Sequence, residues 1–255
     1  MDIAELRRSL PTTLIGKHLQ YYQSTGSTMD LAREAARKGS PEGTVILAEE
    51  QTQGRGRFDR QWIAPPKDNL YFSVILYPTS YAFKRLTMAS SLGVARGITN
   101  ASGLPVSIKW PNDIRSNGKK LGGILLESAV DNNRIGHAVI GIGINVNLDP
   151  SLYPDIAETS TSLKIETGRP VSREAVLKSV LQELDNVYLA LTFEEDLRKP
   201  WIDLLETLGK WVQVTWGDEQ EEGFAEDVNE YGELILRRSD NSFVNLPFGE
   251  VTLQV

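Results

Sequence analysis

Hydrophobic residues along this chain recur at helical spacing in four segments. The strongest pattern begins at Ser172, where apolar residues such as Val176, Val180 and Leu184 share one face, and it stops before Phe193. A shorter segment starts at hydroxyl residues that can cap a helix and is closed by basic residues and a glycine. The helical pattern predicts helices over 28–38, 82–100, 172–192 and 194–208, with Pro200 interrupting or kinking the last.

Other apolar runs are short and are bounded by turn-forming residues, which is typical of strands. In the first part of the chain they predict strands over 44–50, 69–77, 106–110, 121–130 and 134–147. The last two would pair through a turn at 131–133. Because helices are mixed with strands that we expect to be antiparallel, the predicted fold class is α+β.

The chain changes character near Gly209, where helical spacing gives way to short strands separated by polar clusters. Strands are predicted over 211–216, 223–228, 234–238 and 251–255, with turns at 217–220, 229–233 and 239–242. This pattern is typical of a small β-barrel or sandwich. We therefore expect a larger domain over 1–208, with its core at 21–192, and a small β-domain over 209–255.

Composition narrows the class of protein. The chain has 255 residues, 40% hydrophobic and 24% charged, as in ordinary globular proteins. It has no cysteine, which excludes disulfides, thiolate metal sites and a cysteine nucleophile. Neither a signal peptide nor a membrane span is apparent, so we expect a cytoplasmic protein with no membrane partner. The formal net charge of −7 argues against a nucleic-acid-binding protein.

The polar stretch at 51–62, called the glycine–arginine loop below, is the most informative segment. It begins with Gln51, and Gly54 and Gly56 then alternate with Arg55 and Arg57. Glycines let the backbone approach a ligand closely, and guanidinium groups present forks suited to phosphate and carboxylate oxygens. The loop is therefore a candidate for enclosing an anion during a reaction. A solvated surface loop with incidental arginines is the alternative.

Lys109 ends a predicted strand and is followed by Trp110, Pro111, Asn112 and Asp113. A lysine in a half-buried strand is costly unless it meets a negative partner, which a substrate carboxylate or α-phosphate would supply. An edge-strand lysine that reaches solvent is the alternative. Asp113 is a candidate Mg²⁺ ligand, but an aspartate after Pro-Asn is equally a turn former.

Other candidates are two lysines in a basic turn, two amides at the end of an apolar strand and two hydroxyls at a helix start. They are Lys119, Lys120, Asn145, Asn147, Ser27 and Thr28. The lysines could simply face water, and the amides could bond a ribose or cap a turn. The hydroxyls have a structural role as helix caps, but a helix N-terminus also suits a polar ligand group.

Several common catalytic signatures are absent. The sequence has no Walker loop, no GxGxxG fingerprint and no GxSxG elbow. Its only histidines are His18 and His137, so a zinc site is implausible. If the protein uses ATP, cationic side chains rather than a P-loop would hold the phosphates.

Taken together, these segments resemble the biotin–protein ligase family. The resemblance covers about 21–147, and the tail over 223–237 is similar to the family's C-terminal domain. GRGR, KWPND and GIGIN in this order form a specific combination, although each is weak alone. The matching residues are Ser27, Thr28, Gln51, Gly54, Arg55, Gly56, Arg57, Arg60, Trp62, Lys109, Trp110, Pro111, Asn112, Asp113, Lys120, Gly123, Gly141, Ile142, Gly143, Ile144 and Asn145.

The resemblance implies a catalytic domain related to the class II aminoacyl-tRNA synthetase and lipoate ligase fold, with a mixed, mainly antiparallel sheet. It also implies a small C-terminal SH3-like barrel and an ATP-dependent ligase that forms an amide bond. Biotin and MgATP would give biotinyl-5′-AMP and pyrophosphate, and a lysine of a biotin carboxyl carrier protein would then displace AMP. The expected substrates are ATP and biotin, with Mg²⁺ as the metal ion.

Site roles follow from this resemblance and from the need for cations to bring a carboxylate and a triphosphate together. The expected catalytic residues are Arg55, Arg57, Lys109, Asp113 and Lys120. Those expected to bind biotin are Ser27, Thr28, Met29, Gln51, Arg55, Gly56, Arg57, Lys109, Gly122 and Gly123. ATP or the adenylate is assigned to Arg55, Arg57, Trp62, Lys109, Asn112, Lys120 and Asn145. Closure of the glycine–arginine loop would keep the adenylate from water.

The sequence departs from the family in two places. Met29 stands where the family often has asparagine, so a hydrogen bond expected there is open to question. About twenty residues precede the match, whereas a DNA-binding helix-turn-helix domain needs roughly fifty or more. We therefore expect a short-form ligase that does not bind DNA, and a homodimer only by analogy. The alternatives are a ligase for lipoate or another carboxylic acid on the same fold, a non-catalytic biotin or nucleotide sensor, and a DNA-binding regulator.

Overall fold

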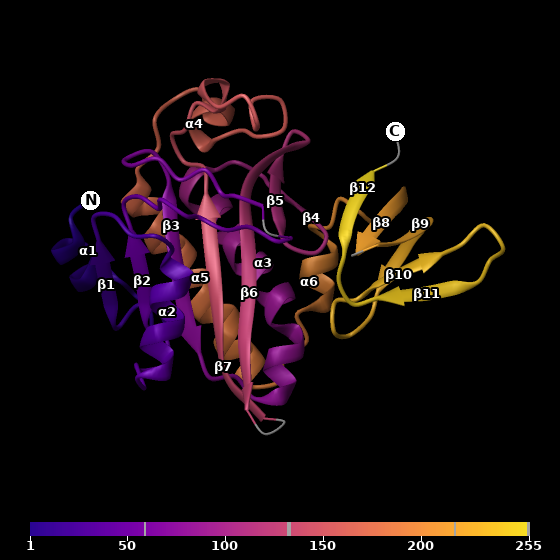
Figure 1. Cartoon of the computed structure of the whole chain (residues 1–255), viewed down its shortest axis with the longest axis horizontal. Coiled ribbons are helices and arrows are strands. Elements are labelled where there is room, and N and C mark those ends of the chain that lie inside the picture. Colours follow the sequence, from indigo (N-terminus) through magenta and orange to yellow (C-terminus); the bar gives the residue numbers. More distant parts are fainter. Residues whose placement is uncertain (59, 132–133, 217, 254–255) are drawn as a thin grey trace.

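The computed structural model describes residues 1–58, 60–131, 134–216 and 218–253 of the chain, and two β-sheets organise them (Figure 1). The helical elements are α1 (Ile3–Ser9), α2 (Thr28–Arg37), α3 (Ser80–Ser102), η1 (Pro150–Leu152), α4 (Leu163–Thr167), α5 (Arg173–Thr192) and α6 (Arg198–Ile202). The strands of the large sheet are β1 (Leu19–Tyr22), β2 (Val45–Ala48), β3 (Leu70–Leu76), β4 (Ser107–Lys109), β5 (Asp113–Ser116), β6 (Lys119–Asp131) and β7 (Arg134–Ile144). Those of the small sheet are β8 (Trp211–Trp216), β9 (Glu219–Val228), β10 (Leu234–Arg237), β11 (Phe243–Leu246) and β12 (Glu250–Leu253).

The large sheet has the strand order β1-β2-β3-β7-β6-β5-β4. Its β1–β2 pair is parallel, and the other neighbouring strands among the described residues pair in antiparallel fashion. The predicted α+β class and the mixed, mainly antiparallel sheet are therefore confirmed. The strands β6 and β7 form the predicted long hairpin, and residues 132–133 of the turn expected between them lie outside the described residues.

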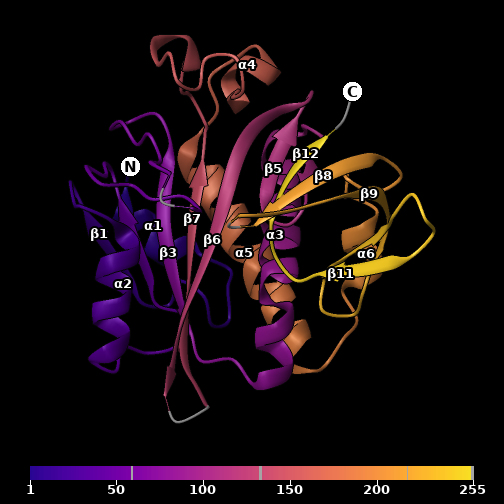
Figure 2. The ribbon, with the colours of Figure 1, turned by 45° about the vertical axis from the view of Figure 1, so that its right-hand side comes forward.

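Alternating side chains on the central strands divide the core into two layers. Val45 and Leu47 of β2 belong to the main hydrophobic cluster, which also contains the apolar faces of α3 and α5. Ile46, Ile75 and Val139 point to the opposite face, where they meet Met29, Ala32 and Ala36 of α2. The helix α2 thus covers one face of the sheet, and α3 with α5 covers the other (Figures 1 and 2).

Most of the predicted long helices are present, but single elements differ from expectation. The prediction of a helix over 194–208 is wrong, because only the short α6 forms there. Pro200 lies in its first turn, where the missing N–H has no intrahelical partner to lose. The turn expected at 217–220 is also partly wrong, because β9 already begins at Glu219. Gly217 and residues 254–255 of the last predicted strand lie outside the described residues.

Several short elements were missed, namely α1, β1, β5, α4 and β11. The three missed strands have four residues each, which is too short for a period to stand out in the sequence. Their pairing in space therefore depends on neighbours that are distant in the chain. Among the described residues, no helix combines the length and the apolarity needed to cross a bilayer.

The small sheet is entirely antiparallel, with the order β11-β10-β9-β8-β12, as expected for the C-terminal β-domain. Specific hydrogen bonds join it to the part of the chain that carries the large sheet. The indole Nε1 of Trp110 donates to the Gly232 carbonyl at 2.8 Å, and Arg198 Nε donates to the Val228 carbonyl at 2.7 Å. Gly209, with φ 74°, lies two residues before β8, but the domain ranges 1–208 and 209–255 stay a prediction.

A buried carboxylate anchors the N-terminal segment to α5. Asp185 is 3% exposed, and its oxygens accept the backbone N–H groups of Thr13 at 2.6 Å, Leu14 at 2.9 Å and Ile15 at 2.7 Å. Buried N–H groups without an acceptor are costly, and a carboxylate can accept several of them at once. This side chain therefore fixes the entry to β1 and the left edge of the sheet in Figure 1.

Replacing this anchor should destabilise the fold. We expect Asp185→Ala to lower the free energy of unfolding by about 3 kcal/mol, because three N–H groups, that of Ile15 buried, lose their acceptor. Urea unfolding followed by circular dichroism measures the change. Asn186→Ala, at an exposed position of the same helix, is the control and should change stability little. Equal effects of the two substitutions would contradict the anchoring role of Asp185.

Candidate active site

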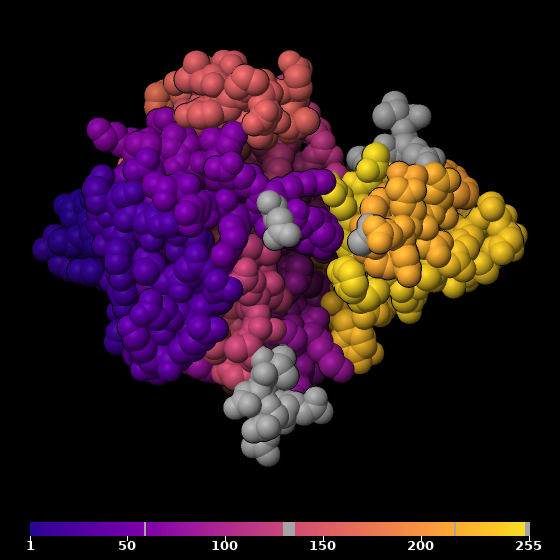
Figure 3. All heavy atoms as spheres, in the orientation of Figure 1, coloured from indigo at the N-terminus to yellow at the C-terminus, as the bar shows by residue number. Residues whose placement is uncertain are grey.

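A cavity of about 410 Å³ lies where the start of α2, the glycine–arginine loop, the central strands and the start of β12 meet. In the space-filling view the purple segment that contains the loop extends across the sheet toward the yellow C-terminal strands (Figure 3). Every predicted site residue except Gly122 lines this cavity. Residues from five distant parts of the chain are thus brought to one place.

Gly122 was assigned to biotin binding, but it does not line the cavity. Neighbouring residues of a strand face opposite sides of the sheet. A Cβ built on Gly122 would meet Ile114, which belongs to the main hydrophobic cluster on the α3 and α5 side. A Cβ built on Gly123 would instead meet Trp62 and Lys120, which line the cavity. Gly123 therefore faces the site, and Gly122 faces away from it.

The floor of the cavity is the backbone of β7 at two glycines. A Cβ on Gly143 would lie 2.5 Å from Cε2 of Trp62, and a Cβ on Gly141 would lie 2.5 Å from the Sδ of Met29. Any side chain at these positions would collide with groups that line the site. The GIGIN segment therefore supplies space rather than functional groups at these two positions, and it lets ring and thioether groups lie directly on the sheet.

The start of α2 places two buried hydroxyl groups at one end of the cavity. Ser27 is the N-cap and accepts the N–H of Met29, which confirms its predicted capping role. Thr28 donates to Gln51 Oε1 from its N–H at 2.8 Å and from Oγ1 at 3.0 Å. Ser73 of β3 donates to Thr28 Oγ1 at 2.8 Å. The residues at the capped start of α2 therefore also form part of the cavity wall.

Arg57 extends from the loop into the cavity and is held by neutral acceptors. Its Nη1 donates to Asn112 Oδ1 at 3.1 Å and to the Gly249 carbonyl at 3.0 Å. Among the described residues, no carboxylate lies within ion-pair distance of the guanidinium. Burial lowers the pKa of Arg57 despite the nearby charges of Asp113 and Glu250, although arginine stays protonated. The group is hydrogen-bonded without being neutralised.

Lys109 is the second cation of this kind. It ends β4, and its register partner in β5 is Asp113, but Asp113 forms its ion pair with Lys120 instead, at 2.7 Å between Oδ1 and Nζ. No described carboxylate forms an ion pair with Lys109. Burial lowers the pKa of Lys109, and the charge of Asp113 offsets this only in part. The lysine is half-buried in the cavity wall, as expected, and does not extend freely into solvent.

Arg55 differs from Arg57 although both belong to the same loop. Arg55 Nη2 lies 2.8 Å from Asp30 Oδ1 and 3.6 Å from Glu127 Oε1. Arg33 pairs with the same two carboxylates, so four alternating charges form one network at the rim of the cavity. The charge of Arg55 is therefore compensated by ion pairs, whereas no carboxylate in the described ranges pairs with Arg57.

Trp62 lies over the glycine floor and beside Lys120, whose Nζ is 5.5 Å from the ring centroid. Its indole Nε1 is buried and has no hydrogen-bond partner among the described residues. A polar donor at this depth normally finds an acceptor. Trp62 therefore presents an aromatic surface to the cavity, whereas its Nε1 faces the backbone of Gly143. Its assignment to the adenylate stays a prediction.

The amides at the end of β7 have different surroundings. Asn145 lines the cavity but is buried, and its Nδ2 donates to the Thr161 carbonyl at 3.1 Å. Its assignment to the adenylate stays a prediction. Asn147 exchanges two bonds with the backbone of Val171, each 2.9 Å long, and thus caps a turn. Lys119 faces solvent, whereas Lys120 lines the cavity.

Sequence reasoning missed the contribution of the small sheet. Gly249, Glu250 and Val251 line the cavity at the start of β12. Glu250 forms two bonds of 2.5 Å with Arg60, so it holds the glycine–arginine loop from the other side. The segment around Asp155 to Ser160 also lines the site. No local signal marks these residues, because their role depends on contacts across the whole chain.

The described residues contain no cluster of three histidine, cysteine, aspartate or glutamate side chains that could hold a metal ion. Asp113 is a carboxylate in the cavity, but Lys120 already engages one of its oxygens. Mg²⁺ is commonly bound by one or two carboxylates together with substrate phosphates. The residues present fit a metal ion that binds mainly through a substrate, and they do not form a metal cage of their own.

Comparison with known proteins agrees with this arrangement. Residues 21–145 match the model of the biotin/lipoate A/B protein ligase family. The chain is 30% identical over 243 residues to the biotin–[acetyl-CoA-carboxylase] ligase of Mycobacterium tuberculosis, which covers 90% of this chain and 88% of that protein. It is 40% identical over 181 residues to the bifunctional ligase/repressor BirA of Bacillus subtilis, covering 70% of this chain and 56% of that protein. The chain thus spans about half the length of that relative.

A solved structure with the same fold extends the similarity to nearly the whole chain. The biotin protein ligase from Aquifex aeolicus, in complex with biotin and ATP, superposes with a TM-score of 0.80 and 26% sequence identity, covering 93% of this chain and 99% of that one. Both the predicted catalytic fold and the C-terminal sheet fall within this match. The chain therefore belongs to the biotin protein ligase family.

Proposed function

We propose that the chain is a biotin–protein ligase. It would activate biotin with MgATP as biotinyl-5′-AMP and then transfer biotin to a lysine of a biotin carboxyl carrier domain. The observation that carries this proposal is the pair Arg57 and Lys109, two cations in one cavity without an ion-pairing carboxylate among the described residues. Family membership and the substrates named for its relatives support the choice of biotin and ATP.

The first step joins two anions, which explains the need for uncompensated cations. A biotin carboxylate oxygen forms a bond to the α-phosphorus of ATP while the bond to the β-phosphate oxygen breaks and pyrophosphate leaves. Carboxylate and triphosphate repel each other, and charge accumulates on the α-phosphate oxygens. Arg57 and Lys109 would neutralise that charge in a partly dehydrated site, where their effect is larger than in water.

The second step is an acyl transfer. The amine of the carrier lysine attacks the acyl carbon of the mixed anhydride, the bond from that carbon to the AMP oxygen breaks, and a proton leaves the nitrogen. Lys120, which is ion-paired with Asp113 and lies beside Trp62, would contact the phosphate that departs with AMP. Closure of the glycine–arginine loop, which Arg60 links to the small sheet, would protect the anhydride from water.

The finer assignments are proposals of the same kind. Mg²⁺ would enter as part of MgATP, with the phosphates supplying most of its oxygen ligands and Asp113 one carboxylate at most. Ser27, Thr28 and Gln51 would hold the polar part of biotin at the start of α2. We also propose a cytoplasmic location, a carboxylase carrier as partner, no DNA binding and a homodimer.

The activity is tested directly with labelled biotin, MgATP and a biotin carrier domain. We expect label on the carrier, and exchange of labelled pyrophosphate into ATP that requires biotin. A carrier with its target lysine changed to arginine is the control and should stay unlabelled while exchange continues. Exchange with lipoate alone would identify a lipoate ligase. Biotin binding without exchange would identify a sensor.

Removing the charge of Lys109 should raise the stability of the protein and lower its activity. The lowered pKa means that the folded protein disfavours protonated Lys109 at every pH below the ordinary lysine value. We therefore expect Lys109→Met to raise the free energy of unfolding by about 1 kcal/mol at pH 7. The same change should slow biotin-dependent pyrophosphate exchange by roughly 100-fold or more.

Chemical unfolding and exchange rates measured on the same preparation check both effects. Lys119→Met removes an exposed lysine of the neighbouring turn and should leave both quantities nearly unchanged. A destabilised Lys109→Met protein, or one that retains full exchange, would refute the role of an uncompensated cation.

A further inference from the structure

Glu49 is a buried carboxylate that belongs neither to the cavity nor to the hydrophobic core. It directly follows β2 and precedes Gln51, the first residue of the glycine–arginine loop, by two positions. Its side chain is 5% exposed, and it is absent from the cavity lining. A charged group this deeply buried requires a complete set of partners.

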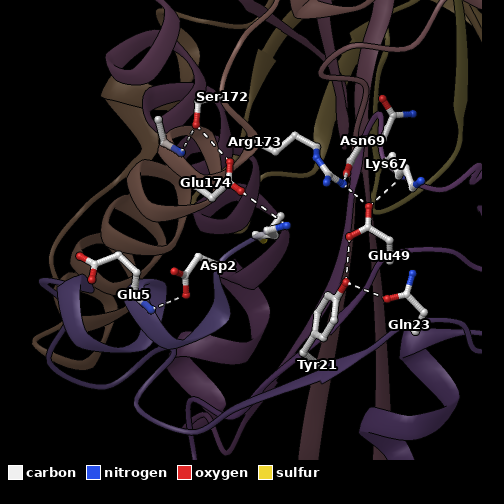
Figure 4. Close-up of polar contacts among 12 residues, drawn as sticks. Asp2, Glu5, Tyr21, Gln23, Glu49, Lys67, Asn69, Ser172, Arg173 and Glu174 are labelled. Carbon is white, nitrogen blue, oxygen red and sulfur yellow. Dashed lines mark hydrogen bonds and ion pairs between the residues drawn. The ribbon is translucent and has the colours of Figure 1, made fainter.

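Four segments of the chain meet at this carboxylate (Figure 4). Oε1 accepts Arg173 Nη1 at 2.6 Å and the backbone N–H of Lys67 at 2.8 Å, and Oε2 accepts the hydroxyl of Tyr21 at 2.9 Å. Arg173 also donates to the Asn69 carbonyl at 3.2 Å. Burial acts to raise the pKa of Glu49, but the bonds from Arg173 and Tyr21 leave that pKa below its ordinary value. The carboxylate is therefore ionised and fully bonded.

Lys67 is the residue at which the chain returns from the loop toward β3. Its φ of 76° lies in the left-handed region, which is strained for a residue with a side chain. Such a conformation persists only where surrounding contacts impose it. The bond from the Lys67 N–H to Glu49 is such a contact, so Glu49 fixes the backbone on both sides of the loop.

The glycine–arginine loop is hairpin-like, and its two ends, next to Glu49 and Lys67, form what we call its neck. Gln51 N donates to the Ala64 carbonyl at 3.3 Å, and Trp62 N donates to the Gly54 carbonyl at 2.9 Å. At the far end, Arg57 and Arg60 reach Gly249 and Glu250 of the small sheet. A change of backbone direction at the neck is therefore carried to Arg57 at the tip.

From these contacts we propose that Glu49, paired with Arg173, is a positioning residue that sets the geometry of the glycine–arginine loop. It acts through Lys67 and Gln51 and touches no substrate. Its role in retaining an adenylate rests on the proposed function, whereas its role in holding the loop does not. The two can therefore be tested separately.

The chain provides a matched control at the other end of the same strand pair. Glu42 precedes β2, and its Oε1 accepts the N–H of Tyr77 after β3 at 2.8 Å and the hydroxyl of Tyr188 at 2.6 Å. Like Glu49, it accepts one backbone N–H and one phenol. Unlike Glu49, it is far along the strands from the loop, so Glu42→Gln removes a comparable carboxylate without touching the neck.

The loop contains Arg55, Arg57 and Arg60, so its opening is measured by trypsin cleavage after these residues in the folded full-length protein. Native-state cleavage rises with the population of the open form. We expect Glu49→Gln to be cleaved there about 10-fold faster than the wild type, and Glu42→Gln to match the wild type within about 2-fold. Cleavage sites are identified by mass spectrometry.

A rescue variant distinguishes positioning from general loosening. Glycine adopts the left-handed conformation without strain, so Lys67→Gly in the Glu49→Gln background should return cleavage most of the way to the wild-type rate. Biotinyl-AMP release should follow the same order, faster in Glu49→Gln and slower again in the double variant. If Glu49→Gln does not fold, Arg173→Lys, which weakens the same pair, takes its place with the same expectation.

Equal cleavage of the Glu49→Gln and Glu42→Gln proteins would overturn the proposal, as would a double variant that remains as open as Glu49→Gln. A wild-type protein without biotin-dependent exchange would instead remove the proposed function. The cleavage comparison would still decide the role of Glu49 in that case.

Discussion

A positive charge that is partly removed from water needs an anion or a set of hydrogen-bond acceptors around it. Among the described residues, Arg57 has only neutral acceptors, the amide of Asn112 and the carbonyl of Gly249. Asp113, the register partner of Lys109, is ion-paired with Lys120 instead. Neutral acceptors satisfy N–H groups but leave the charge in place. Within the described part of the chain, these are two cations without an ion-pairing carboxylate, so a bound anion would balance their charge.

The placement of these two cations in one cavity depends on elements that are far apart in the chain. The loop presents Arg57, and the β4–β5 hairpin presents Lys109. The glycine backbone of β7 leaves room for Trp62 and Met29 beside them in the same cavity. The small sheet completes the site, because Gly249 bonds Arg57 and Glu250 bonds Arg60. It is therefore part of the cavity wall, and the hydrogen bond from Trp110 to Gly232 helps to attach it.

Local patterns in the sequence were sufficient to predict the long helices, the β6–β7 hairpin and part of the cavity wall. The loop and Lys109 could be found because glycine, arginine and strand-end lysine have distinctive chemistry. The difference in ion pairing between Arg55 and Arg57 could not be predicted from the sequence, because it depends on Asp30 and Glu127, which pair with Arg55 only in the folded chain. The face of Gly122 and the role of Glu250 depend on strand register and on contacts across 190 residues, neither of which leaves a local signal.

The most direct test of this account is the titration of Lys109 in solution. Lysines labelled with ¹³C at Cε are followed by NMR, and the Lys109 resonance is identified by its loss in Lys109→Met. The account predicts a pKa below that of an ordinary lysine in the free protein, and a clear rise when a stable analogue of biotinyl-5′-AMP binds. An ordinary pKa that is unchanged by the analogue would contradict it.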